Sequence, residues 1–197
     1  MRRVYWILIF LMYPALASTL AAQKAPDISS LCAQLNEPST TDQAARRILQ
    51  AARKDSDVRQ YMVEKLPGMI DKTETGKVWL NAVRLAGHLK ASETIPSLQR
   101  AFSRGQFGRP AGTTLGAEMQ LDDDVVAKAL SEIGDPSLPS VKDFLKSDDL
   151  KVRRRAVLIL MNMNSLAARK VLQDRLSYET DPRIRDLIED DLRSKSQ

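Results

Sequence analysis

Side chains that carry catalysis or bind metals are scarce in this sequence. Its 197 residues include one cysteine, Cys32, and one histidine, His88, so neither an internal disulfide nor a zinc site of the usual ligand types can be assembled. A Cys–His nucleophilic pair would require Cys32, in a polar N-terminal segment, to reach His88 at a predicted helix end. Aromatic residues make up 5% of the chain, which leaves few rings to hold a base or a chromophore. The sequence therefore predicts no enzyme, no cofactor and no metal.

The first 22 residues, in contrast, have the three-part organisation of a secretory signal peptide. Arg2 and Arg3 precede an apolar core at residues 4–12, and small residues then dominate as far as Ala22. The apolar run is shorter than the ~20 residues of a membrane-spanning helix, although an uncleaved signal anchor is the alternative. Cleavage after Ala17 or Ala22 would export the protein to the periplasm or the exterior without an integral membrane segment.

Residues 23–40 are polar, contain Pro26 and Pro38, and are predicted to form a disordered linker. Cys32 in this segment either pairs between chains or is a small residue in a mobile stretch. Loss of Arg2 and Arg3 with the signal peptide lowers the formal net charge from +5 to +3, which is too small to argue for a nucleic-acid partner. The sequence leaves the oligomeric state open.

Residues 41–197 are predicted to form one helical domain, because apolar residues recur there at helical spacing. Thr41 is the expected N-cap of the first helix. A second helix is expected to start near Ser56 and to stop at Pro67-Gly68, so that the two helices form an antiparallel pair.

Three later segments repeat one pattern, in which apolar or small residues follow each other at intervals of four. The three sets are Val78, Ala82 and Ala86; Val125, Ala129 and Ile133; and Val152, Ala156 and Leu160. Gly87 and Gly134 follow the third position and are expected to be left-handed C-caps, and Ile184 begins an incomplete copy. Because no helix pair buries its apolar face alone, the sequence predicts an all-α solenoid of four to five stacked antiparallel helix pairs.

A glycine-rich insertion at residues 104–121 interrupts the repeats and holds half of the eight glycines. It lacks the Gly-Lys-Ser/Thr ending of a phosphate loop, and no strand precedes it. Long loops in compact folds are either functional or disordered, and both interpretations stay open. Arg104, Phe107 and Arg109 are the candidate partner-binding residues, because an aromatic ring between two arginines matches the composition of binding hot spots. The alternative for Phe107 is packing against the helices.

Two runs of three charged residues lie at the starts of predicted helices. Asp122-Asp123-Asp124 directly precedes the helix that starts at Val125, so it is expected to cap that helix rather than to bind a cation. Arg153-Arg154-Arg155 stands in the first turn of a later helix. One of these arginines is expected to contact the neighbouring repeat, and the other two are expected to face water.

The repeats resemble those of HEAT-repeat proteins, in particular the short bacterial HEAT-like repeats of the phycobilisome-lyase type. The matching residues are Asp57-Val58-Arg59, Ile133-Gly134-Asp135-Pro136, Asp149 with Val152-Arg153, and Asp181-Pro182 with Ile184-Arg185. The pattern lacks its arginine at Val78-Trp79 and Val125-Val126 and its Gly-Asp at Met161-Asn162. The resemblance implies structural roles for Asp135 and Arg153 in linking adjacent repeats, with Asp135 either bracing its turn or pairing with Arg153.

These observations favour an exported, non-enzymatic module that binds another protein, whose identity the sequence does not contain. The lyase-type resemblance gives one alternative, a HEAT-like lyase or another enzyme-associated repeat protein. A structural component of envelope assembly is a further alternative, in which the final half-repeat caps the array or serves as an edge for dimerisation.

Overall fold

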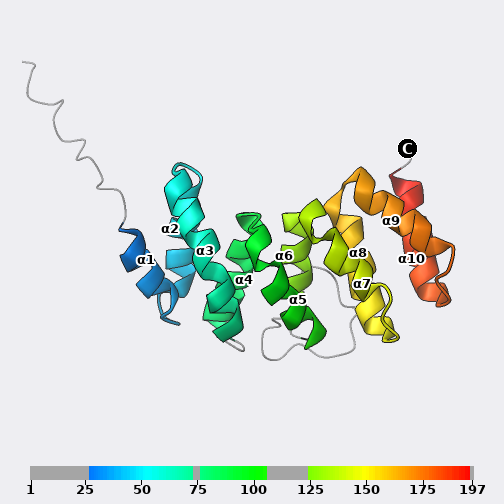
Figure 1. The fold of residues 1–197 in the computed structure, drawn as a ribbon, viewed down its shortest axis with the longest axis horizontal. Coiled ribbons are helices and arrows are strands. Elements are labelled where there is room, and N and C mark those ends of the chain that lie inside the picture. The colour runs from blue at the N-terminus through cyan, green and yellow to red at the C-terminus, as the bar shows by residue number, and fades with distance from the viewer. Residues whose placement is uncertain (1–26, 73–75, 106–123, 196–197) are drawn as a thin grey trace, which may run out of the picture.

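A computed structural model describes residues 27–72, 76–105 and 124–195, and in these ranges it contains α-helices and short 3₁₀ turns but no strand (Figure 1). The helices follow one another along the long axis of the molecule, which confirms the predicted all-α solenoid. The helices are α1 (Ile28–Leu35), α2 (Thr41–Ala52), α3 (Ser56–Lys72), α4 (Lys77–His88), α5 (Ile95–Ser103), α6 (Val125–Ile133), α7 (Leu138–Phe144), α8 (Leu150–Met163), α9 (Leu166–Leu176) and α10 (Pro182–Ser194).

The helices are arranged in two rows. In the first row, α2, α4, α6, α8 and α10 pack side by side in this order. The second row contains α3, α5, α7 and α9, and its helices pack against the first row: α3 against α2 and α4, α5 against α6, α7 against α8, and α9 against α8 and α10. The motif Asp57-Val58-Arg59 begins α3 in the second row, whereas the similar motifs at Arg153 and Arg185 begin helices of the first row.

The repeated apolar pattern forms the core of the first row. The central alanines of the three copies, Ala82, Ala129 and Ala156, are at most 2% exposed. Gly134 ends α6 with a positive φ of 82°, which favours glycine, although its ψ of −144° is not that of the predicted left-handed cap. Gly87 does not, since it lies inside α4, where an added Cβ would come within 2.9 Å of the Ala129 Cα atom. Gly87 therefore permits the close approach of α4 and α6.

Part of the predicted linker is a helix, so the prediction of disorder is wrong for residues 27–40. Asp27 caps α1 by accepting a hydrogen bond from the Ser29 N–H, and Leu31 and Leu35 are buried as α1 packs against α2. Cys32 is half-buried in α1 with its Sγ 3.4 Å from the Met62 Sδ, and burial raises the pKa of the thiol. The helix is therefore docked by Leu31 and Leu35, with Ile28 and Cys32 packed against the same core.

The helix α3 continues through Pro67 and Gly68 to Lys72, so the predicted stop is also wrong. A proline inside a helix costs roughly 3 kcal/mol, because it removes a hydrogen bond and crowds the preceding turn. Leu66 and Ile70, on either side of Pro67 and one turn apart, are both fully buried. Burial of these two side chains offsets the cost of the proline.

Residues 1–26 lie outside the described ranges, so the signal peptide stays a prediction. Among the helices that the structure does describe, none is both long and apolar enough to cross a membrane.

Candidate functional site

Of the three candidate partner-binding residues, the structure describes Arg104 alone. Arg104 is the C-cap of α5, is exposed, and forms no ion pair with any residue of the described ranges. Phe107, Arg109 and the remainder of the insertion from residue 106 lie outside these ranges. The described part of the site is therefore the surface from which the insertion departs and to which it returns.

A shallow hollow of about 430 Å³ lies along the exposed side of α5 and reaches Arg104; it is lined by Pro96, Gln99, Arg100, Ser103 and Arg104. Arg100 pairs with Asp71 of α3 at 2.7 Å, and Ser97 donates a hydrogen bond to the same carboxylate. The hydrogen bond from Arg100 is the main reason why the pKa of Asp71 lies below its usual value. Arg100 is thus paired with a carboxylate, whereas Arg104 acts on Asp71 through its charge alone and forms no ion pair with a described residue.

The two ends of the insertion are joined by Arg155 of α8, which is 2% exposed. Its Nη1 donates to the Phe102 carbonyl at 3.0 Å, near the end of α5, and its Nε donates to the Asp124 carboxylate at 2.5 Å, at the start of α6. The guanidinium also lies over the Phe102 ring, 3.6 Å from its centroid. Arg155 therefore fixes the entry and the exit of the insertion to the core.

Asp124 caps α6 in addition to pairing with Arg155. Its Oδ1 accepts the Ala127 N–H at 3.0 Å while its Oδ2 faces Arg155, and the residue is 2% exposed. The predicted capping role is confirmed for Asp124, whereas Asp122 and Asp123 lie outside the described residues. Phe102, the ring that Arg155 also contacts, stacks on the Phe144 ring of α7 with 4.1 Å between the ring centroids.

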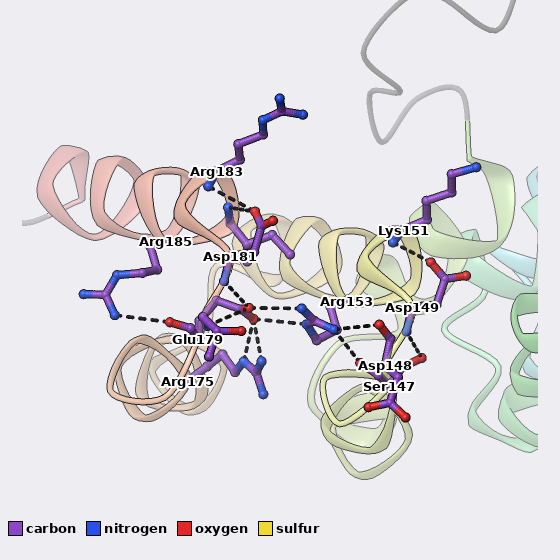
Figure 2. A network of polar contacts seen from close by, with 12 residues as sticks. Ser147, Asp148, Asp149, Lys151, Arg153, Arg175, Glu179, Asp181, Arg183 and Arg185 are labelled. Carbon is purple, nitrogen blue, oxygen red and sulfur yellow. Dashed lines mark hydrogen bonds and ion pairs between the residues drawn. The ribbon is translucent and has the colours of Figure 1, made fainter.

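Arg153 links two consecutive turns of the solenoid (Figure 2). Its Nη1 donates to the carbonyls of Ser147 and Asp148 in the turn before α8, at 2.8 and 3.1 Å. Its Nε and Nη2 donate to the Glu179 carboxylate in the turn before α10, at 3.3 Å each. These contacts are those of a residue that links adjacent repeats, but the acidic partner is Glu179 and not Asp135.

Asp135 lies in a 3₁₀ turn, η3 (Asp135–Ser137), where it is exposed. Its side chain forms no hydrogen bond or ion pair with another residue of the described ranges. The turn is braced instead by Ser137, whose hydroxyl contacts the carbonyls of Leu130 and Gly134 at 2.9 Å each. The expected bracing function therefore belongs to the serine two residues later.

Glu179 is a fully buried carboxylate that gathers donors from both sides of its turn (Figure 2). Besides Arg153, it accepts hydrogen bonds from the Arg175 side chain and from the N–H groups of Thr180 and Asp181, the latter two at 3.0 Å. Burial favours the protonated carboxyl, but the Asp181 N–H and the two arginines outweigh it. The pKa of Glu179 consequently lies below its usual value.

The contact of Arg155 with Asp124 has a counterpart near the N-terminus, made by the residue at the equivalent position of an earlier repeat. Asn81 stands three residues after Val78, as Arg155 stands three residues after Val152. The Asn81 amide donates to Asp42 at 2.7 Å and to the hydroxyl of Thr41 at 3.2 Å, at the start of α2. In both repeats this side chain reaches the start of the preceding first-row helix, a regularity that the apolar pattern did not reveal.

His88, the single histidine of the chain, has a carboxylate as its neighbour. His88 Nδ1 lies 3.0 Å from Glu132 Oε2 of α6, and the pair is at the surface. No group of three or more histidine, cysteine, aspartate and glutamate side chains in the described parts of the chain is placed to hold a metal ion.

Comparison with known proteins identifies the repeats. Residues 123–193, which cover α6 to α10, match the family model of HEAT repeats. No curated protein and no solved structure matches the chain. HEAT repeats generally mediate protein interactions and are generally not catalytic themselves. The matched residues are thus similar to HEAT repeats, and the helices of the other described ranges stack in the same two-row arrangement.

Proposed function

We propose that the protein is an exported scaffold that binds another protein through the insertion at residues 104–121 and the hollow beside Arg104. The observation that carries this proposal is the contact of Arg155 with both ends of the insertion. A long loop that departs from a buried, hydrogen-bonded base is a typical way to present a binding segment on a rigid framework.

The fixed base lowers the cost of binding. A loop whose ends are free to move must be ordered when a partner binds, and that entropy opposes association. Phe102 and Asp124 are already held by Arg155, and Phe102 is also stacked on Phe144. The two residues that flank the insertion are therefore already in place before a partner binds.

The proposed export rests on the basic start, apolar core and small residues of positions 1–22. Expression of the full chain in a bacterial host, followed by fractionation and intact-mass measurement, tests it. We expect a periplasmic product that begins after Ala17 or Ala22. A full-length product retained in the membrane fraction would establish the signal anchor instead.

Binding through the insertion is tested by affinity capture from an envelope extract of the native host. We expect the double variant Phe107→Ala/Arg109→Ala to lose a specific partner that the wild-type protein retains. The control is Lys142→Ala/Lys146→Ala on the α7 side, which removes two exposed side chains at a distance from the insertion in sequence. Retention of the same partner by the insertion variant, with an unchanged melting temperature, would refute the role of the loop.

A further inference from the structure

A second surface, at the N-terminal end of the first row, carries three exposed cations around one carboxylate. The cations are Arg46 of α2 and Lys77 and Arg84 of α4, and the carboxylate is Asp42 of α2. We refer to Arg46, Lys77 and Arg84 as the cation cluster.

The position of the cation cluster follows from one buried hydrogen bond. Asn81 is 5% exposed and donates to Asp42, which fixes this face of α4 against the start of α2. Arg46 lies one turn after Asp42, and Lys77 and Arg84 lie one turn on either side of Asn81. The three cations therefore flank the Asn81–Asp42 contact on a single face of the first row.

The three cations of the cluster outnumber the carboxylate of Asp42, on which all three of their charges act. None of the three cations forms an ion pair within 4.0 Å with a residue of the described ranges. The hydrogen bond from Asn81 and then the charges of Lys77, Arg46 and Arg84 hold the pKa of Asp42 below its usual value, so Asp42 is ionised at neutral pH. Some exposed cations elsewhere are paired with carboxylates, as in Arg100–Asp71, Lys146–Asp143 and Arg193–Asp190, whereas others, such as Arg104, form no ion pair with a described residue.

We infer that the cation cluster binds an acidic segment of a partner protein, in which several aspartate or glutamate side chains follow one another. The cations are separated by helical turns and distributed over two helices, which suits carboxylates spaced along a chain. A compact dianion such as phosphate would meet the negative charge of Asp42. This inference rests on the proposed function as a protein-binding scaffold, and it supplies the chemistry of one contact.

The inference is tested with a fluorescein-labelled peptide of eight alternating aspartate and glutamate residues, titrated with the full chain lacking residues 1–22. We expect saturable binding at low salt that weakens as salt screens the charges. The variant Arg46→Gln/Arg84→Gln should bind about tenfold more weakly. The matched control, Lys142→Gln/Lys170→Gln, removes the same charge from the second row and should bind like the wild type.

Equal binding by the cluster variant and the wild type would overturn the inference, as would an equal loss in the control. If a DNA duplex binds more tightly than the peptide, the cation cluster is a nucleic-acid site instead. If the chain self-associates in sedimentation and the cluster variant does not, the cluster binds a second copy of the chain. Circular dichroism melting curves of both variants establish that the substitutions leave the fold intact. If the wild-type protein captures its partner but does not bind the peptide, the role of the cation cluster is refuted and the proposed function stands. If the insertion variant still captures the partner, the proposed role of the insertion is refuted instead.

Discussion

The same repeat position carries a neutral contact near the N-terminus and a charged one near the C-terminus. Asn81 reaches Asp42 at the start of α2, and Arg155 reaches Asp124 at the start of α6. Asp42 is exposed, whereas Asp124 and Arg155 are each 2% exposed. The two contacts have similar positions and very different surroundings.

The difference shows where this fold uses charge for its own stability. Burial removes most of the solvation of a carboxylate, and a paired cation compensates for this loss, as Arg155 does for Asp124. The exposed Asp42 retains its solvation, and an amide is sufficient to orient it. The charges around Asp124 are thus bound within the fold, whereas those around Asp42 remain available to a partner.

The largest effect is expected from Asp124→Ala. This substitution removes the cap of α6 and takes the carboxylate away from buried Arg155, so the free energy of unfolding should fall by about 3–5 kcal/mol. Urea denaturation measures it. The control Asp143→Ala, which removes an exposed pair with Lys146, should cost less than about 1 kcal/mol. A similarly small loss for Asp124→Ala would mean that the buried pair does not stabilise the base of the insertion.

A smaller effect, with a defined pH dependence, is expected from Glu179→Gln. The folded pKa of Glu179 is lowered, so its contribution to stability is complete above the unfolded value of about 4.3 and is lost as the pH falls through the folded value. We expect the variant to be less stable than the wild type by about 2 kcal/mol at pH 7. Thermal melting between pH 7 and pH 3 should show the two proteins converging in acid. A constant difference would contradict the assigned ionisation.

Asn81→Ala tests the neutral contact of the comparison. Loss of its hydrogen bonds to Asp42 and Thr41 should lower the melting temperature by about 2–4 °C, well below the effect of Asp124→Ala. Differential scanning calorimetry measures the shift. If Asn81→Ala proves as damaging as Asp124→Ala, the proposed distinction between an exposed and a buried contact is wrong.

The smallest effect is expected from Asp135→Ala. The side chain is exposed and has no partner in the described parts of the chain, so the change in stability should stay within about 0.5 kcal/mol. Ser137→Ala is the informative neighbour, because it removes the contacts with two carbonyls and should cost about 1 kcal/mol or more. The reverse order in chemical denaturation would restore Asp135 as the residue that braces the turn.

The helical spacing predicted most of the fold, because it reports which face of each helix is buried. The central alanines Ala82, Ala129 and Ala156 were correctly placed between neighbouring helices in this way. The spacing did not reveal α1, since Leu31 and Leu35 are a short signal in a polar segment. It also failed at Pro67, where the burial of Leu66 and Ile70 against other helices outweighs the local preference of proline against a helix.

The polar contacts were harder to predict for a different reason. Arg153, Arg154 and Arg155 are adjacent in the sequence, and successive helix positions differ by about 100° in direction. Which of them is buried depends on acidic partners far along the chain, namely Glu179 for Arg153 and Asp124 for Arg155. The prediction that two of the three arginines face water is wrong, because both Arg153 and Arg155 are buried. A single sequence does not contain these pairings.

The contact between Arg155 and Phe102 also bears on how the chain folds. Helical-repeat arrays are held mainly by contacts between neighbours, and their ends can unfold separately. Arg155 and Phe102 are 53 residues apart in sequence, so α8 must dock before the start and the end of the insertion are held together. Bringing Phe102 and Arg155 together costs the entropy of closing the chain segment between them, and the contacts that offset this cost form only when α5, α6 and α8 assemble. These three helices should consequently fold and unfold as one cooperative unit, even though α5 and α6 are joined through the longest connection between described helices.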